Sequence, residues 1–156
     1  MSSRQAVVEP ATAGDVDRLV DLMEGYCAFY RFPSPGTEAL KMMALTEIAA
    51  DDNDGMMIVA RVPDAPGGVA GFVHVTWKMA LLQANRIAIM EDLFVDPDFR
   101  GRGCGRLLVD AAIDRARELG SPVLQWVTQT TNVTAQSLYD RTGAYSEAWL
   151  EYEMEL

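Results

Sequence analysis

The strongest constraint on the fold of this chain is a passage in which an apolar segment runs into a glycine-rich loop. Residues 87–95 are almost continuously apolar, and Glu91 and Asp92 are the only charges among them after Arg86. Such a segment is typical of a strand that is covered on both faces and therefore lies in the middle of a sheet. The loop 100–105 follows, and an amphipathic helical pattern extends from there to Leu119. A buried strand, a glycine loop and a helix thus come in direct succession.

The remaining patterns fill out one domain across residues 1–156. Helices are predicted after the capping residue Thr12, over 37–50 and over 134–142. The other predicted strands are 6–9, 56–62, 69–77, 123–128 and 151–156, the last from its strict alternation. This order of elements predicts an α/β (α+β) fold with a mixed sheet and helices on both faces.

The charge balance narrows the classes of ligand. There are 23 acidic and 13 basic side chains, a formal net charge of −10, whereas sequence-independent binding of nucleic acid requires a basic surface. We therefore expect no nucleic acid partner. A cationic substrate would be attracted, but an excess of acid also serves simply to keep a protein soluble, and charge alone does not separate these interpretations.

Cysteine usage and the first residues indicate a cytoplasmic protein. Cys27 and Cys104 are too few for a disulfide framework and lack the paired spacing of a metal site. The N-terminal residues lack the apolar core of a secretion signal, and no stretch approaches the length that spans a membrane. We expect reduced thiols, no metal, no membrane association and a cytoplasmic location.

The loop after the buried strand has the composition of an anion site. Glycine lets the backbone turn tightly and approach a ligand, and the free amides at a helix N-terminus then point at an anion. Arg100, Arg102 and Arg106 add positive charge in an acidic protein. Glycines are also plain turn formers, so the surrounding pattern has to decide what the loop binds.

Two named phosphate loops do not fit this pattern. The Walker loop requires lysine and then serine or threonine after its last glycine, whereas Arg106 and Leu107 stand here. The dinucleotide fingerprint belongs to a parallel unit near the first strand, whereas these glycines come after a predicted antiparallel hairpin. A nucleotide triphosphatase and a nicotinamide enzyme are both disfavoured.

The C-terminal half resembles the GNAT superfamily of N-acetyltransferases. The acetyl-CoA loop of that family reads Arg or Gln, two residues, Gly, one residue, Gly or Ala, and Arg100, Gly103 and Gly105 match it. Segments 91–97 and 132–143 are also similar to the family. The acidic pair in the first segment, with a tyrosine in the second, resembles the diamine acetyltransferase branch in particular. The N-terminal half matches only in the order of its elements.

The resemblance implies a fold and a co-substrate. It implies a GNAT-like, mostly antiparallel sheet of about six to seven strands, splayed open between the fourth and fifth, with acetyl-CoA in the gap. The pantetheine arm would lie along Leu93, Phe94 and Val95, and Asn132 matches an asparagine that contacts it, a role compatible with helix capping. The loop residues implied to hold the pyrophosphate are Arg100, Gly101, Arg102, Gly103, Cys104, Gly105 and Arg106.

Acetyl transfer to an amine requires a neutral nitrogen, a stabilised oxyanion and a proton for the departing thiolate. Tyr139 matches the family's tyrosine near the CoA sulfur and is assigned as general acid, and a backbone amide such as that of Leu93 is expected to meet the oxyanion. Glu91 is the first candidate base, because its strand is expected to be buried and because it matches the acidic position of the diamine branch. The alternatives are a water chain, or a Glu91 that only orients substrate. Asp92 points to the opposite face unless a bulge intervenes.

Other side chains have both a structural and a chemical interpretation. His74, the only histidine, lies in a predicted hairpin strand, from which it could share in proton transfer, although packing is the commoner role. Cys104 invites a covalent acyl-enzyme scheme, but its place among phosphate-binding amides favours a small packed side chain. Five aromatic residues could form a wall of the substrate site that attracts a cation, or could simply pack in the core. They are Tyr26, Phe29, Tyr30, Phe32 and Trp77.

The sequence therefore predicts an acyltransferase that moves acetyl from acetyl-CoA directly to the primary amine of a small molecule. The alternatives are a protein or peptide N-acetyltransferase with the same acetyl-CoA half, and a non-catalytic acyl-CoA-binding module. The alternating segment 151–156 is expected to pair across a homodimer interface, or to form an ordinary edge strand guarded by its glutamates.

Overall fold

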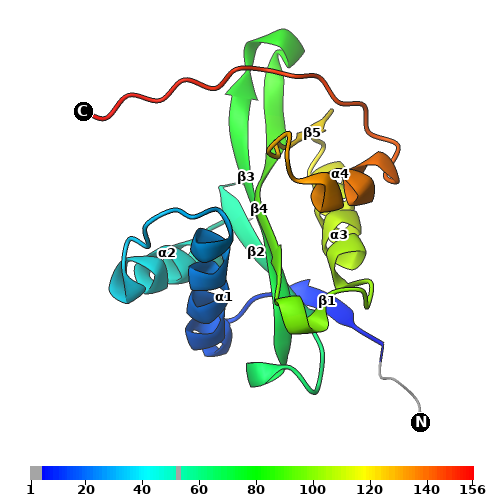
Figure 1. The fold of residues 1–156 in the computed structure, drawn as a ribbon. Coiled ribbons are helices and arrows are strands. Elements are labelled where there is room, and N and C mark those ends of the chain that lie inside the picture. The colour runs from blue at the N-terminus through cyan, green and yellow to red at the C-terminus, as the bar shows by residue number, and fades with distance from the viewer. Residues whose placement is uncertain (1–4, 52–53) are drawn as a thin grey trace.

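The computed structural model describes residues 5–51 and 54–156. The elements in chain order are β1 (Val7–Pro10), α1 (Val16–Phe29), α2 (Thr37–Ala49), β2 (Gly55–Arg61), β3 (Val69–Ala80), β4 (Asn85–Val95), α3 (Cys104–Glu118), β5 (Leu124–Gln125) and α4 (Val133–Asp140). One sheet in the order β1-β2-β3-β4-β5 separates α1 and α2 on one face from α3 and α4 on the other (Figure 1). The predicted α/β architecture with helices on both faces is confirmed.

The sheet is antiparallel from β1 to β4 and parallel only at its last pair. β4 and β5 pair through Ala88 with Leu124 and Ile89 with Gln125, and no further. Among the described residues, no strand pairs with the remainder of β4, residues 90–95, on this side. We call this stretch the open edge of β4. It lies between the fourth and fifth strands, where the family resemblance implies that the sheet splays open.

Each face of the sheet carries its own apolar core, because side chains alternate along a strand. Val73 and Val75 of β3 pack toward α3, whereas Phe72 packs toward α1 and α2. The amphipathic pattern predicted up to Leu119 is confirmed, and α3 begins at Cys104, directly after the glycine loop. The residues that α3 buries are Cys104, Leu108, Val109, Ala112 and Ala116.

A β-bulge in β4 places two neighbouring carboxylates on one face. His74 of β3 pairs with Asp92, but the residue after His74 pairs with Met90, so Glu91 is an extra residue. Glu91 accepts a hydrogen bond from Thr76 Oγ1 at 2.6 Å, and Asp92 Oδ2 lies 3.2 Å from His74 Nδ1. His74 and Thr76 are two apart on β3 and so share a face, the one that α1 and α2 cover. The bulge therefore brings Asp92 to the face of Glu91, whereas a regular strand would place it on the opposite face.

The strand predicted over 151–156 is not formed, and the one predicted over 123–128 shrinks to the two residues of β5. The part of the chain that the structure describes forms five strands, so the expected count of about six to seven is wrong. After α4 the chain continues as an irregular tail, residues 144–156, which in the view of Figure 1 crosses the β3–β4 hairpin near its turn. All large apolar side chains of this tail are at least 80 % exposed. Alternation makes a strand only where another edge supplies hydrogen bonds, and the pattern does not specify that edge.

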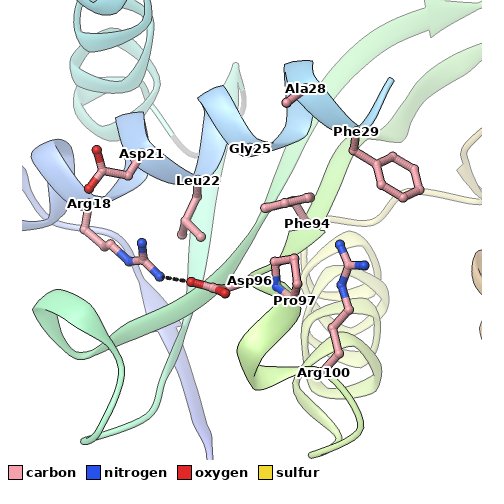
Figure 2. A pocket seen from close by; sticks show the side chains of 10 residues that line it. All are labelled: Arg18, Asp21, Leu22, Gly25, Ala28, Phe29, Phe94, Asp96, Pro97 and Arg100. Carbon is pink, nitrogen blue, oxygen red and sulfur yellow. Dashed lines mark hydrogen bonds and ion pairs between the residues drawn. The ribbon is translucent and has the colours of Figure 1, made fainter. Parts of the chain in front are cut away.

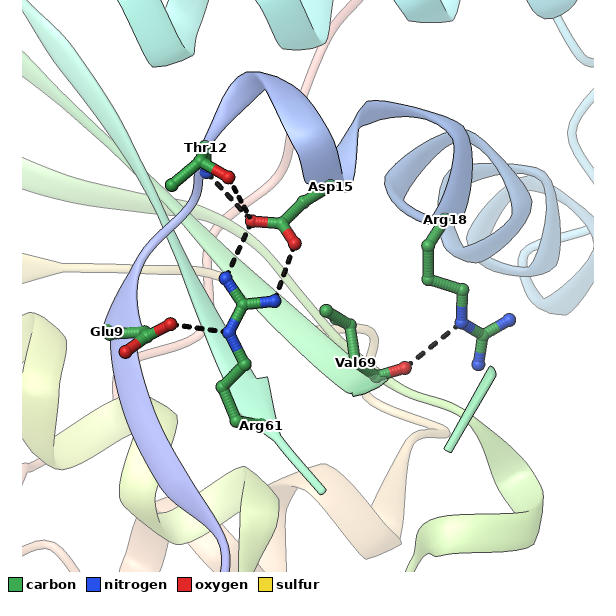
Figure 3. Close-up of polar contacts among 6 residues, drawn as sticks. All are labelled: Glu9, Thr12, Asp15, Arg18, Arg61 and Val69. Atoms are coloured by element: carbon green, nitrogen blue, oxygen red, sulfur yellow. Dashed lines mark hydrogen bonds and ion pairs between the residues drawn. The ribbon is translucent and has the colours of Figure 1, made fainter. Parts of the chain in front are cut away.

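A buried ion pair fastens the start of α1 to the sheet (Figure 3). The backbone amide of Thr12 donates to Asp15 at 2.8 Å, as the predicted capping pattern requires. Asp15 is 6 % exposed and accepts two hydrogen bonds from Arg61 of β2, at 2.5 and 2.8 Å. Arg61 also pairs with the more exposed Glu9 of β1. Burial opposes ionisation of Asp15, but the hydrogen bonds from Arg61 and Thr12 outweigh it and hold its pKa below the ordinary value.

Replacing Asp15 by asparagine should lower the free energy of unfolding by about 3 kcal/mol, because Arg61 would stay largely buried without its charge partner. Glu9→Gln removes the exposed partner of Arg61, since the Glu9 side chain is 49 % exposed. It should lower the free energy of unfolding by less than about 1 kcal/mol. Urea unfolding followed by circular dichroism measures both variants.

The difference in the free energy of unfolding between wild type and Asp15→Asn should depend on pH in a defined direction. Since folding lowers the pKa of Asp15, its contribution is complete above the ordinary carboxyl pKa and is lost as pH falls through the folded-state pKa. The gap between wild type and Asp15→Asn should therefore narrow in acid. Equal losses for the Asp15 and Glu9 variants at neutral pH would contradict the assignment.

Candidate functional site

The open edge of β4 is the centre of the candidate site. Leu93 and Val95 turn their side chains toward α3, and Phe94 is buried against α1. Their backbone on the side of β5 has no strand partner within the described chain. Unpaired strand backbone of this kind can bind an extended ligand through main-chain hydrogen bonds. The three residues expected to line pantetheine therefore lie together along one accessible edge.

The glycine loop at the end of this edge has the geometry of an anion site. Gly101 and Gly103 have φ angles of 74° and 83°, which glycine adopts without steric cost. A Cβ at either position would meet nothing within 4 Å, so the backbone rather than packing requires glycine. Gly103 caps α3, and the amide of Leu107 donates to its carbonyl. The amides of residues 104–106 precede the first bonds of the helix and are oriented toward an incoming anion.

Cys104 is a packed side chain. It is 1 % exposed and belongs to the core between the sheet and α3. Burial raises the pKa of its thiol, which disfavours the reactive thiolate. The geometry supports the packing interpretation over a covalent acyl-enzyme.

Arg100 turns its side chain toward α1 (Figure 2). Its guanidinium carbon lies 5.6 Å from the ring centre of Phe29 and 5.5 Å from that of Phe94, and its Nε donates to the Val95 carbonyl at 2.9 Å. These groups border a cavity of about 390 Å³ between α1 and the end of β4. The residues that line it are Arg18, Asp21, Leu22, Gly25, Ala28, Phe29, Phe94, Asp96, Pro97 and Arg100. The cavity thus joins the glycine loop to the aromatic end of α1.

The other two arginines of the loop are held in exposed ion pairs. Arg102 lies 3.2 Å from Asp64, and Arg106 lies 2.9 Å from Asp110. All four side chains are at least 44 % exposed, so each pair contributes at most about 1 kcal/mol. A phosphate arriving at the loop competes with such pairs at little cost.

Three tyrosines approach the open edge from opposite faces of the sheet. Tyr139 of α4 packs edge-on against Trp126, with ring centres 5.4 Å apart. Tyr26 and Tyr30, at the end of α1, have ring centres 4.8 Å apart. Burial, followed by the charge of Tyr30, raises the pKa of Tyr139 to about 12. The Tyr139 hydroxyl therefore keeps its proton at neutral pH and is available as a donor.

The carboxylates of the bulge have different surroundings. Glu91 is exposed, so the expectation that it is buried is wrong, because the bulge removes it from the regular packing of the strand. Asp92 is half-buried beside His74. Burial, and then the charge and hydrogen bonding of Asp92, raise the pKa of the Tyr26 hydroxyl. Asp92 is therefore connected to groups on both α1 and β3.

His74 is 5 % exposed and lies between two carboxylates. Its Nδ1 is 3.2 Å from Asp92 Oδ2, and its Nε2 is 2.9 Å from Oε2 of Glu47 on α2. Burial lowers the pKa of His74, but hydrogen bonding to the two carboxylates outweighs burial and raises it above the ordinary value. Sequence reasoning missed Glu47, because it stands 27 residues before His74 and no spacing rule links them.

The expected aromatic wall forms in part. Tyr26, Phe29 and Tyr30 cluster at the end of α1, where the Phe29 and Tyr30 ring centres are 5.1 Å apart. Trp77 packs into the core on the α3 face, so the expectation that it joins the aromatic wall is wrong. Phe32 lies beyond the end of α1 and is 67 % exposed.

Polar groups beside β5 fit a ligand with amides. Asn132 caps α4, with its Oδ1 accepting from the amide of Ala135 at 3.2 Å, which leaves its side-chain NH₂ group as a donor. The Thr128 hydroxyl, in the segment that leaves β5, is buried without a hydrogen-bond partner among the described atoms. A buried polar atom of this kind indicates a missing partner. The amide-rich pantetheine arm fits that requirement.

Two kinds of feature are absent from residues 5–51 and 54–156. No helix in these ranges is both long and apolar enough to cross a membrane. The same ranges hold no group of three or more His, Cys, Asp or Glu side chains placed to bind a metal ion. The expectations of no metal and no membrane association stay predictions.

Known proteins share both the sequence pattern and the fold. Residues 19–144 match the Acetyltransferase (GNAT) family. The uncharacterized N-acetyltransferase YhfO of Bacillus subtilis is 30 % identical over 138 residues, which make up 87 % of each chain. D-amino-acid N-acetyltransferase HPA3 of Saccharomyces cerevisiae is 36 % identical over 77 residues, 49 % of this chain and 48 % of HPA3.

Among solved structures, a transcriptional regulator from Bacillus halodurans C-125 superposes with a TM-score of 0.79 at 24 % identity. The match covers 97 % of this chain and 100 % of the regulator. At that identity the likeness concerns the fold alone, since one fold hosts many functions.

Proposed function

Because this chain belongs to the Acetyltransferase (GNAT) family and is an acetyl-CoA-dependent acyltransferase, we propose that it transfers acetyl directly to the primary amine of a small molecule. One observation carries the proposal. The open edge of β4 leads from a glycine loop whose backbone geometry suits an anion toward Tyr139, a tyrosine that stays protonated at neutral pH. Acetyl-CoA supplies an activated acyl group on a thioester.

The residues along the open edge account for the binding of acetyl-CoA. The backbone of Leu93, Phe94 and Val95 is assigned to pantetheine, with Asn132 and Thr128 as polar contacts from the other side. The pyrophosphate is assigned to the loop and the N-terminus of α3, where the dipole of the helix favours negative charge. The residues assigned there are Arg100, Gly101, Arg102, Gly103, Cys104, Gly105 and Arg106.

The catalytic groups are assigned from their positions around the same edge. Tyr139 is the general acid that donates a proton to the departing thiolate. The backbone amide of Leu93 stabilises the oxyanion, because main-chain donors fixed by a sheet need no reorganisation. Glu91 receives the proton of the attacking amine, directly or through an ordered water.

Two features support a small cationic acceptor. Aromatic rings at the end of α1 and the carboxylates of Glu91 and Asp92 lie on the same face of the sheet, and both attract an alkylammonium group. The relative HPA3 is named for acetylation of D-amino acids, which are small amines. A peptide acceptor and a non-catalytic acyl-CoA-binding module are the competing outcomes of the test.

The test separates binding from turnover. Calorimetric titration with acetyl-CoA measures binding, and thiol release is then screened with diamines, amino acids, aminoglycosides and short peptides. The proposal expects binding and release with a small amine. Release with peptides alone supports the peptide enzyme, and binding without any turnover supports the acyl-CoA-binding module. Absence of binding would refute the assignment of the glycine loop.

Tyr139→Phe should lower kcat about 100-fold while leaving the Kd for acetyl-CoA unchanged, because it removes the donated proton and keeps the ring that packs on Trp126. Steady-state thiol release and calorimetry measure the two constants. The matched control is Tyr145→Phe, since Tyr145 is 94 % exposed in the tail. A Tyr139→Phe enzyme with wild-type kcat would remove Tyr139 from the mechanism.

Glu91→Gln should reduce kcat/KM for the amine about 100-fold, because an amide cannot accept the proton, while its shape keeps the contact with Thr76. The loss should shrink at high pH, where more of the amine is already neutral. Initial rates measured across the pH range decide this. A loss that is constant with pH would show that Glu91 orients the amine without taking its proton.

We also propose that the tail, residues 144–156, pairs as a strand with a second copy of the chain. Its alternating side chains Tyr152, Met154 and Leu156 are all at least 80 % exposed, and β5 has an unpaired outer edge in the sheet as described. Burying large apolar side chains contributes roughly 1.5–3 kcal/mol each, which is sufficient to hold such a strand in place.

Met154→Lys should convert the dimer to a monomer, because it places a charge on the apolar face of the tail. Glu153→Lys introduces the same residue on the opposite face and should leave the dimer intact. Light scattering coupled to size-exclusion chromatography measures the mass of each. A monomeric wild type would contradict the proposal.

A further inference from the structure

A buried histidine connects the candidate site to a second cavity, which is lined by the end of α2, the start of β2 and residues of α3. His74 is 5 % exposed, and each of its ring nitrogens faces a carboxylate, Asp92 at 3.2 Å and Glu47 at 2.9 Å. The carboxylates belong to different elements, β4 and α2, and approach the ring from opposite ends. Burying an ionisable group costs free energy unless it is paired, and here both partners of the buried imidazole are themselves ionisable and partly buried.

The two ends of this chain of contacts differ in their surroundings. Asp92 lies next to Glu91 in the bulge and interacts with the hydroxyl of Tyr26, so it faces the proposed acceptor site. Glu47 lines a separate cavity of about 410 Å³ at the edge of the sheet. The Asp92 and Glu47 side chains are 25 % and 22 % exposed, whereas that of His74 is 7 % exposed. A buried imidazole therefore bridges two carboxylates that each contact solvent.

The absence of a side chain at Gly55 makes room for the carboxylate of Glu47. A Cβ at Gly55 of β2 would lie 2.1 Å from Oε2 of Glu47, the oxygen that contacts His74. Any side chain at position 55 would therefore push this carboxylate away from the imidazole. Gly55 and Glu47 together hold the contact in place.

We infer that Asp92, His74 and Glu47 form a proton relay, which carries the proton lost by the acceptor amine from the cleft to water in the cavity at Glu47. The inference rests on the proposed acetyl transfer. The N–H bond of the attacking amine breaks and the carboxylate pair of the bulge takes the proton. Asp92 passes it to Nδ1 of His74, and Nε2 releases its own proton to Glu47 and from there to water. A flip of the ring, which exchanges the positions of the two nitrogens, then restores the starting tautomer without returning the proton.

The charges around His74 determine in which direction kcat should change with pH. The ionisable groups that face it or its partners are Glu47 from α2, Asp92 and Glu91 from β4, and Tyr26 and Cys27 from α1. Residue Met57, opposite on β2, is not ionisable. Burial lowers the pKa of His74, and the hydrogen bonds and charges of Asp92 and Glu47 raise it above the ordinary value. The imidazole has to be neutral to accept a proton, so kcat should fall in acid as His74 becomes protonated.

Two variants interrupt the outer half of the relay without touching the acceptor site. Glu47→Gln removes the charge, and Gly55→Ala displaces the carboxylate without removing it. Both should lower the pKa of His74, shift the acidic limb of kcat to lower pH and reduce kcat at its plateau about tenfold. Glu38→Gln is the matched control, because it removes the same charge from an exposed position on the same helix. It should change neither quantity.

The chain has a single histidine, so nuclear magnetic resonance follows its titration without assignment ambiguity. The pKa of His74 is measured in wild type, Glu47→Gln, Gly55→Ala and Glu38→Gln, and kcat is measured against pH for the same four proteins. If the relay operates, the fall of kcat on the acidic side of its pH profile should move with the pKa of His74. A His74 pKa that shifts while the limb and the plateau stay in place would overturn the relay and leave acetyl transfer standing. Absence of thiol release by the wild type with every amine would refute the proposed function itself.

Discussion

The separation of β4 from β5 after two paired residues is the constraint on which the rest of the site depends. Backbone groups inside a sheet are normally satisfied by the neighbouring strand, and β4 gives up that partner over residues 90–95. The Ser121 hydroxyl fixes where pairing begins, accepting from the amide of Ala88 at 2.8 Å and donating to the Val123 carbonyl at 2.6 Å. Beyond that point Trp126 and Tyr139 pack on the core, and no described residue continues the strand.

The bulge at Glu91 also shapes the site, because one extra residue in β4 changes which side chains meet on each face of the sheet. Without it Glu91 and Asp92 would point to opposite faces, since side chains alternate along a regular strand. With it, both reach the face that α1 and α2 cover, where Asp92 meets His74 and Glu91 meets Thr76. An irregularity in the strand therefore places the two carboxylates, one of which is the proposed base, on one face of the sheet.

Local interactions explain why much of the architecture was predictable. The stripe of α3, the capping residues Thr12 and Asp15, and the glycines of positive φ are each set by contacts within a few residues. The tail shows the opposite case. Its alternation describes one face of a strand but does not specify a partner edge, and within the described chain none is paired with it.

By itself, the sequence determined the order of elements as far as α4, the glycine loop at Arg100–Gly105 and the candidate acid Tyr139, because these follow from periodicity, backbone conformation and short motifs. Only the tertiary structure decided which charges share a face and which lie buried together. The contact of His74 with Glu47 spans 27 residues, and that of Arg61 with Asp15 spans 46. Such contacts depend on how helices and strands pack in space, and a local pattern contains no information about packing between distant segments.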